Sequence, residues 1–207
     1  MISHYSFEMG RVKGLTPDET RRRVIEGAAE AFAELGFERA RVTDIARAAG
    51  LSSGAMYNHF DSKAALLGAV VECHAADELM ELVASGDAST LLDLVLARAK
   101  QLGAPGAFPA PLLVEAVHSA RRDPEVLRIL SEQVAGREDL FTVVITSAQA
   151  DGQVTDEVDP RATARFMLAV LIGSIMVQAM DLPPLEDGQW DSFMTRLVDT
   201  FRPQEQP

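Results

Sequence analysis

The sequence predicts an all-α protein with about nine helices, in which an N-terminal three-helix domain containing a helix-turn-helix precedes a larger helical domain. Three observations predict this fold. Helix-start signals recur, each a capping side chain followed by proline, at Thr16-Pro17, Asp123-Pro124 and Asp159-Pro160. No segment alternates apolar and polar residues with the period of two that marks a half-buried strand. With 207 residues, 47% of them hydrophobic and 24% charged, the composition is that of a globular protein.

The first helix is expected to begin at the capping box Thr16-Pro17-Asp18-Glu19, whose Thr hydroxyl and Glu carboxylate can satisfy backbone N–H groups reciprocally. Gly36-Phe37 is typical of a left-handed C-terminal cap for this helix. A second helix is expected over 42–49 and ends at Gly50. Apolar residues at helical spacing predict the inward faces: Ile25, Ala28, Phe32 and Leu35 in the first helix, and Val42, Ile45, Ala46 and Ala49 in the second.

The third helix is expected to be short and to begin after Ser52, whose hydroxyl can cap it. Its inward residues are expected to be Leu51, Met56 and Phe60. Asp61 is expected to cap a fourth helix that runs to about residue 84. Proline, glycine and capping signals then predict five further helices, over 89–102, 110–121, 124–150, 160–181 and 188–202.

The net charge of −12 is unevenly distributed along the chain. Residues 1–74 carry nine basic and ten acidic residues, whereas residues 75–207 carry ten and 21. This change predicts an N-terminal domain over 1–74, with a disordered arm over 1–14, and a C-terminal domain over 75–207. An acidic body weakens indiscriminate phosphate binding, but a near-neutral N-terminal domain can still make local basic contacts.

The third helix has the character that reading DNA requires. A helix in the major groove needs small or polar outward side chains, because bulky ones hold the backbone away from the base edges. Ser53, Ala55 and Asn58 are candidates for base contacts, whereas Tyr57 and Lys63 have polar ends suited to phosphates. The alternative for Tyr57 is a buried aromatic with a satisfied hydroxyl. The full set of candidate DNA-binding residues is Arg41, Thr43, Ser52, Ser53, Gly54, Ala55, Tyr57, Asn58, His59 and Lys63.

A specific motif extends over residues 36–67. It consists of G-F at 36–37, V-T-D-I-A-R-A-A-G-L-S at 42–52 and G-A-M-Y-N-H-F at 54–60, followed by Lys63 and Leu66. This motif resembles the DNA-binding domain of the TetR/AcrR family of one-component repressors, and looser similarity extends the match over most of 16–180. Two positions depart from the family pattern, which usually has Thr or Ser at Arg41 and often Lys or Arg at Ser53. Both departures bear on the operator sequence.

The resemblance implies that helices five to eight enclose a small-molecule pocket and that the last two helices pair across a two-fold axis. The residue pattern supports this pairing independently, because the segment 160–181 is apolar on more than one face and must be covered on nearly all sides. Ala169, Gly173 and Val177 form a ridge of small residues, and Trp190 and Phe193 add apolar surface to the last helix. We therefore expect a homodimer, with packing inside a single chain as the alternative.

Candidate ligand-binding residues combine aromatic and methionine side chains with two polar groups, as small-ligand sites do. Glu115 and His118 stand three residues apart on an apolar helix, where they can bond each other or a ligand; a satisfied core pair is the alternative. For Phe141 and Met167 taken singly, core packing is the favoured interpretation. The set is Phe108, Leu112, Glu115, His118, Phe141, Ile145, Met167 and Leu171.

Several other classes of site are not expected. Residues 50–54 match G-x-S-x-G, but that motif forms a nucleophile elbow only after a strand, so we expect no enzyme. The histidines lack metal-ligand spacing, and neither metal nor cofactor is expected. Cys73 is the only cysteine, which favours the reducing cytoplasm. The apolar run over 166–180 would span about 22 Å, less than the ~30 Å of a bilayer core, and is interpreted as a buried helix.

These observations together predict a ligand-responsive transcriptional regulator. The resemblance implies repression by a homodimer on a palindromic double-stranded operator, with release by a small, mostly apolar effector. The alternative is a regulator of the same fold that a protein partner, or oxidation of Cys73, controls in place of a small molecule.

Overall fold

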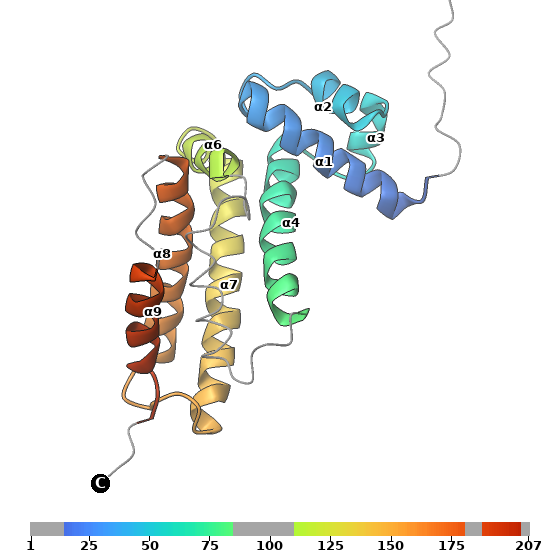
Figure 1. Ribbon diagram of the computed structural model, residues 1–207. Coiled ribbons are helices and arrows are strands. Elements are labelled where there is room, and N and C mark those ends of the chain that lie inside the picture. Colours follow the sequence, from blue (N-terminus) through green and yellow to red (C-terminus); the bar gives the residue numbers. More distant parts are fainter. Residues whose placement is uncertain (1–14, 85–109, 181–187, 204–207) are drawn as a thin grey trace, which may run out of the picture. The chain divides into compact units, whose positions relative to one another are not determined.

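The computed structural model describes residues 15–84, 110–180 and 188–203, with backbone only for 74–84 and 178, and every regular element in these ranges is a helix (Figure 1). The all-α prediction is therefore confirmed. The predicted helix over 89–102 and the candidate residue Phe108 lie outside the described residues. The helices are α1 (Pro17–Leu35), α2 (Val42–Ala49), α3 (Ser53–Tyr57), α4 (Lys63–Ala84), α6 (Ala110–Ala120), α7 (Pro124–Ala150), α8 (Pro160–Ala179) and α9 (Gln189–Asp199).

The chain forms two compact units, Met1–Val70 and Val71–Pro207. The helix α4 contributes its first eight residues to the first unit and its remainder to the second. The boundary inferred from charge, at 74/75, lies in the same helix. The assignment of separate functions to the two parts stays a prediction.

In the first unit, α1 begins at the expected capping box. The backbone N–H of Thr16 donates to Glu19 Oε2 at 2.7 Å, and the Glu19 N–H donates to Thr16 Oγ1 at 3.2 Å. The hydrogen bond from the Thr16 backbone lowers the pKa of the Glu19 carboxyl below its ordinary value, because it stabilises the charged form. The start of this helix is thus fixed by local chemistry.

The end of α1 differs from the expectation at two residues. Gly36 has φ of 77°, which favours glycine, but its ψ of 156° is extended and not left-handed helical. Leu35, expected to face inward, is exposed, whereas Phe37 is 5% exposed and packs its ring 5.5 Å from that of Phe32. The chain turns back at Gly36, so Phe37 covers the core where Leu35 was expected.

The cap of α4 also differs from the expectation. Ser62, not Asp61, immediately precedes the first helical residue, and its Oγ accepts from the N–H of Ala65 at 2.9 Å. Asp61 is exposed, one position too early to reach that N–H group. A capping side chain must stand directly before the first helical residue, which explains the correction.

The core of the second unit lies where α7, α8 and α9 meet (Figure 1). Buried residues from all three helices and from the turn after α7 pack together there, with four half-buried side chains against them. The buried residues are Ile145, Ala148, Val154, Ala164 and Val198, and the half-buried ones are Phe141, Val158, Met167 and Phe201.

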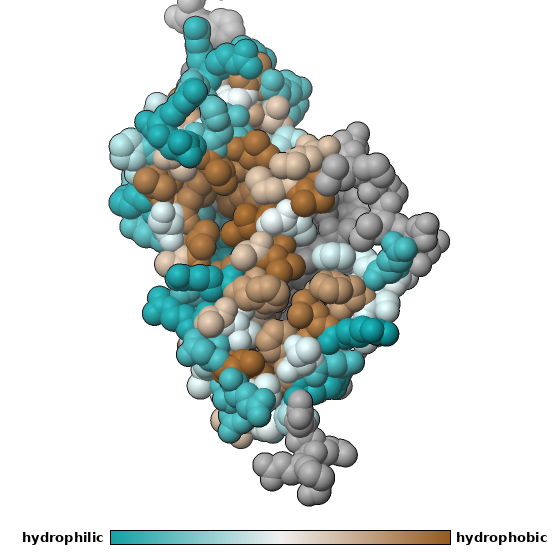
Figure 2. Space-filling model, turned by 90° about the vertical axis from the view of Figure 1, so that its left-hand side faces the viewer, coloured by the Kyte–Doolittle hydropathy of each residue, from teal (hydrophilic) through white to brown (hydrophobic). Residues whose placement is uncertain are grey.

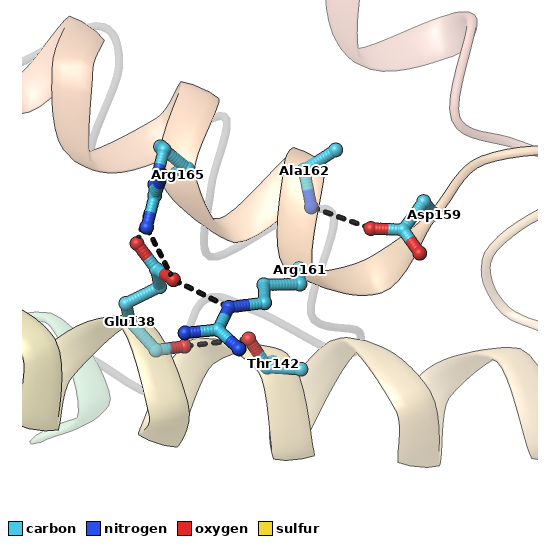
Figure 3. Close-up of polar contacts among 6 residues, drawn as sticks. All are labelled: Glu138, Thr142, Asp159, Arg161, Ala162 and Arg165. Carbon is cyan, nitrogen blue, oxygen red and sulfur yellow. Dashed lines mark hydrogen bonds and ion pairs between the residues drawn. The ribbon is translucent and has the colours of Figure 1, made fainter.

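An ionic cluster joins α7 to α8 beside this core (Figure 3). Glu138 of α7 is 5% exposed, and its carboxylate accepts from Arg161 Nε at 2.7 Å, from Arg165 Nε at 2.7 Å and from Arg165 Nη2 at 2.9 Å. These bonds, with that of Arg165 first, lower the pKa of Glu138 below its ordinary value. A buried carboxylate needs such partners, and the cluster therefore fixes how α7 and α8 align.

An apolar stripe, most of it exposed, runs along one face of α8 and the residue that follows the helix. We call Phe166, Ala169, Gly173, Val177 and Met180 the α8 stripe; Phe166, Val177 and Met180 are 44%, 48% and 69% exposed. Their spacing places them on one side of the helix. Figure 2 views the side of the molecule on which α8 and α9 lie in Figure 1, and apolar surface gathers there.

The exposure of α8 corrects its interpretation as a buried helix. The segment Pro160–Val177 is long and apolar enough to cross a membrane by length and composition, with a mean hydropathy of 1.4, and 17% of it is buried. It nevertheless carries Arg161 and Arg165, which are bonded to Glu138. The helix thus packs one face on α7 and leaves an apolar face exposed.

Candidate nucleic-acid interface

The backbones of α1 and α2 are in close contact at Gly27 and Ala49. A Cβ atom placed on Gly27 would lie 2.5 Å from the Ala49 backbone nitrogen and 2.8 Å from Ala49 Cβ. Val24, Ile25 and Phe32 bury the remainder of this contact. The second helix is therefore held rigidly against the first, which positions everything that follows it.

The entrance to α2 exposes two of the candidate residues. Arg41 is the N-cap residue, and its backbone N–H donates to Asp44 Oδ2 at 3.0 Å. A guanidinium has no acceptor, so Arg41 cannot cap through its side chain, as the departure from the family pattern implied. Arg41 and Thr43 are both exposed. Their side chains face solvent at the start of the helix-turn-helix.

The turn between α2 and α3 is a Schellman motif. Gly50 has φ of 65° and ψ of 32°, the left-handed conformation that favours glycine. The N–H of Leu51 donates to the Ala46 carbonyl at 2.9 Å, and the N–H of Gly50 donates to the Arg47 carbonyl at 3.1 Å. This pairing fixes the angle at which the chain enters α3.

The short helix α3 is anchored from one side and exposed on the other. Met56 is 1% exposed and Phe60, just beyond the helix, is 6% exposed, as predicted. Tyr57 is 59% exposed, which excludes the buried-aromatic alternative. Ser52 occupies the N-cap position, but its side chain makes no capping hydrogen bond; its carbonyl accepts from the Ala55 N–H at 2.9 Å.

The structure therefore brings most of the candidates onto one surface. We call the residues that α3 and its ends offer to solvent the recognition surface. Ser52, Gly54, Tyr57 and Asn58 are exposed, and Ser53, Ala55 and His59 are half-buried. Their assignment to DNA contacts stays a prediction. The recognition surface comprises Ser52, Ser53, Gly54, Ala55, Tyr57, Asn58 and His59.

Lys63 lies apart from this surface. Its Nζ atom donates to the Phe37 carbonyl at 2.6 Å and to the Ala40 carbonyl at 3.2 Å, in the segment between α1 and α2. The predicted phosphate contact of Lys63 stays a prediction. The acceptors are 23 and 26 residues away in sequence, so no local pattern indicated them.

One exposed basic residue of α2, Arg47, was not among the candidates from the sequence analysis. Arg47 follows Thr43 by one helical turn and therefore shares its face of α2. Its side chain is 78% exposed, although one guanidinium nitrogen lies 3.3 Å from Asp44 Oδ1. The i, i+4 spacing from Thr43 is the signal that would have identified it.

Among the candidate ligand-binding residues that the structure describes, three belong to one core and the assignment of the set to a ligand site stays a prediction. Phe141, Ile145 and Met167 lie in or against the core of α7, α8 and α9, which agrees with the core-packing interpretation of Phe141 and Met167. Leu112 is fully buried, whereas His118 is exposed on α6. Glu115 is half-buried, and its Oε1 lies 3.5 Å from the Ser119 hydroxyl. Leu171 is half-buried on α8.

Comparison with known proteins identifies the family. Residues 24–70 match the bacterial regulatory proteins of the tetR family. The HTH-type transcriptional repressor KstR2 of Rhodococcus jostii is 31% identical over 152 residues, which cover 71% of this chain and 74% of KstR2. The chain belongs to the TetR family. It is thus related to transcriptional regulators that bind DNA and not to enzymes.

Solved structures share the fold of this TetR-family chain. A TetR-family transcriptional regulator from Rhodococcus sp. superposes with a TM-score of 0.73 at 24% identity, covering 90% of this chain and all of that one. FadR from Bacillus subtilis, solved in complex with stearoyl-CoA, gives a TM-score of 0.64 at 16% identity, covering 86% and 95%. These likenesses extend over both compact units and confirm the fold class.

Among the described residues, no group of three or more His, Cys, Asp or Glu side chains is arranged to hold a metal ion. Cys73 is half-buried on α4. A redox role for it stays a prediction.

Proposed function

We propose that this TetR-family chain is a ligand-responsive repressor that binds a palindromic operator as a homodimer, with α3 of each copy in the major groove. The observation that carries the proposal is the recognition surface. Its side chains are small or polar and are exposed or half-buried. Met56 and Phe60 are buried and anchor the helix to the core. Ser53, Ala55 and Asn58 are proposed to read base edges, whereas Arg41, Thr43 and Tyr57 contact the phosphate backbone.

The α8 stripe supports the homodimer. Exposed apolar surface on this scale is costly in water, and a second copy of the same stripe would cover it. Phe193 of α9 is 58% exposed and adds to the apolar surface that the two copies would share. Gly173 has no atom within 4 Å of a Cβ placed on it, which leaves room for close approach of a partner helix. A two-fold dimer suits a palindromic operator, whose half-sites lie about 34 Å apart along the duplex.

The effector is proposed to be small and mostly apolar. FadR, which shares the fold, binds stearoyl-CoA, and Leu171 and Glu115 are half-buried and accessible in this chain. Arg137 of α7 donates to Glu72 of α4 at 2.7 Å within the second unit, so a ligand that displaces α7 would act on α4. Effector and operator must each weaken the binding of the other by the same factor.

Selection of bound DNA from a random pool tests the proposal. We expect a palindrome with two half-sites to be enriched and to be held at physiological salt, where random DNA is released. Asn58→Ala should alter the preferred base at one position of each half-site. An unchanged preference would show that Asn58 reads no base, and a pool with no enriched sequence would contradict the proposed function.

A further inference from the structure

Arg21 extends the inward-facing side of α1 with a charged residue. Val24, Ile25 and Ala28 on this side of the helix are buried in the first unit. Arg21 precedes them by three, four and seven residues, so helical periodicity places it on the same side of α1. Arg21 is nevertheless exposed, at the N-terminal end of this buried row. A cation therefore lies at the edge of the core of the first unit.

The guanidinium of Arg21 lies next to the end of α3. Its Cζ atom is 5.2 Å from the centroid of the Phe60 ring, a separation at which the ring quadrupole attracts a cation. Phe60 is buried and directly follows His59, the last residue of the recognition surface. A buried ring thus holds a positive charge of α1 beside the segment that carries the recognition surface.

The contact with Phe60 leaves the hydrogen-bonding capacity of the guanidinium unused. An arginine side chain has five N–H donors, and an aromatic ring offers no oxygen acceptor for them. Within the described part of the chain, Arg21 makes no ion pair with a carboxylate. Its neighbour Arg22 differs, since its Nε atom lies 3.8 Å from Glu26 Oε1. Arg21 is therefore a positioned cation whose donors can serve an acceptor outside the chain.

A backbone phosphate is the acceptor that suits this group in the proposed complex. Arginine can donate two parallel hydrogen bonds to phosphate oxygens, and such charge-assisted bonds are strong. The major groove is about 12 Å wide, whereas five helical residues extend about 7.5 Å. Groups just beyond the end of α3 therefore lie close to the phosphate strands that border the groove.

We propose that Arg21 is a further DNA contact, which donates to a backbone phosphate beside the C-terminal end of α3 in each copy. This inference rests on the proposed function, because it adds a contact from α1 to the same operator complex. A phosphate contact fixes the register of the protein on the duplex and adds affinity, but it reads no base. Arg21 should thus strengthen binding to every DNA sequence equally.

The test compares Arg21→Met, Arg21→Lys and Arg22→Met with the unchanged chain. Methionine keeps an unbranched apolar stem near Phe60 and removes the charge, whereas lysine keeps the charge without the planar fork. Arg22→Met is the matched control, because it removes an adjacent charge that points to another side of α1, towards Glu26. Affinities for the pool-selected operator and for random DNA are measured by fluorescence anisotropy from about 50 to 200 mM salt, and thermal unfolding is recorded in parallel.

We expect Arg21→Met to weaken binding to the operator and to random DNA alike, by roughly tenfold for each copy at about 100 mM salt. The slope of log affinity against log salt should fall by about 0.9 for each copy, because one phosphate contact is lost from each. Arg21→Lys should keep the slope. Arg22→Met should keep the slope and change the affinities by less than about twofold, because an exposed charge that touches no phosphate is screened by salt.

Three results would overturn the inference. Unchanged affinity and salt slope in Arg21→Met would show that Arg21 touches no phosphate. An equal fall in slope for Arg22→Met would show only a general effect of net charge. Weaker operator binding with an unchanged slope and a lowered unfolding temperature would show that Arg21 serves to cover Phe60.

The same measurements separate this inference from the proposed function. Full operator binding by Arg21→Met would remove the phosphate contact and leave the proposed function intact. An unchanged chain that binds no DNA would contradict the proposed function and the Arg21 contact together.

Discussion

The backbone of α1 at Gly27 is in contact with the backbone of α2 at Ala49, since a Cβ on Gly27 would lie 2.5 Å from the Ala49 nitrogen. The obstructing atoms are backbone and Cβ, which no side-chain rotation can move. Gly27→Ala should therefore force the two helices apart and destabilise the first unit by about 1–3 kcal/mol, the usual cost of overpacking. Urea unfolding followed by circular dichroism measures this change.

Gly136→Ala is the matched control. Gly136 is exposed within α7, and a Cβ placed there meets no atom within 4 Å. Alanine should stabilise the chain by about 0.5–1 kcal/mol, because glycine is costly inside a helix. Equal stabilisation by both substitutions would refute the close contact of α1 and α2.

Replacement of Tyr57 should weaken DNA binding without changing the stability of the fold. Its side chain is 59% exposed, so Tyr57→Ala should change the free energy of unfolding by less than about 0.5 kcal/mol. Operator affinity, measured by fluorescence anisotropy, should fall because the proposed phosphate contact is removed. Met56→Ala, at the neighbouring buried position, should instead cost about 2–5 kcal/mol of stability. Normal operator binding by a well-folded Tyr57→Ala protein would remove Tyr57 from the interface.

The α8 stripe predicts that a single charge can abolish self-association. Phe166→Glu should yield a monomer in sedimentation velocity experiments, because a carboxylate buried against a second copy would lack a partner. Val143→Glu on α7 is the control: Val143 is 67% exposed but lies off the stripe, and this variant should remain dimeric. Dimers of Phe166→Glu at micromolar concentration would place the interface elsewhere.

The ion pairs of Glu138 predict that the packing of α7 on α8 becomes less stable at acid pH. Arg165 and Arg161 hold the pKa of its carboxyl below the ordinary value of 4.5. A carboxyl with a lowered pKa in the folded state contributes stability above its unfolded pKa and loses it as pH falls through the folded value. Glu138→Gln should thus be less stable than the unchanged chain at neutral pH, and the difference should shrink below about pH 4.5.

Glu132→Gln is the corresponding control for urea unfolding measured across this pH range. Glu132 pairs with Arg128 at 2.8 Å, but both side chains are more than half exposed. The substitution should change stability by less than about 0.5 kcal/mol at any pH. A pH-independent effect of Glu138→Gln would mean that its charge does not stabilise the helix pair.

Features that depend on only a few consecutive residues were predictable from the sequence. The capping box at Thr16 and the bounds of α7 follow from side chains that act on their own helix. The cap of α4 was misplaced by one residue because Asp61 and Ser62 are both good acceptors, and the path of the preceding turn selects between them. The hydrogen bonds of Lys63 to backbone carbonyls were not predictable, because their acceptors lie in a distant segment.

The candidate ligand-binding residues show the same limit on a larger scale. Residue type suggested a pocket, but whether an apolar side chain lines a cavity or fills a core depends on which helices meet. Ile145 is an apolar residue of the type that lines pockets, yet it belongs to a buried cluster that includes Val198 of α9, 53 positions along the chain. No periodicity in one helix contains that information.

The helix α3, which we propose to enter the major groove, is five residues long, and Met56 is the residue that it buries. So short a helix is not stable alone, and the Schellman turn before it and the Phe60 anchor after it maintain its shape. Ser53 and Ala55 are half-buried and Asn58 is exposed, so none of the three belongs to the buried core. Under the proposed function, exchange of these three residues would redirect the protein to other operators with little effect on folding.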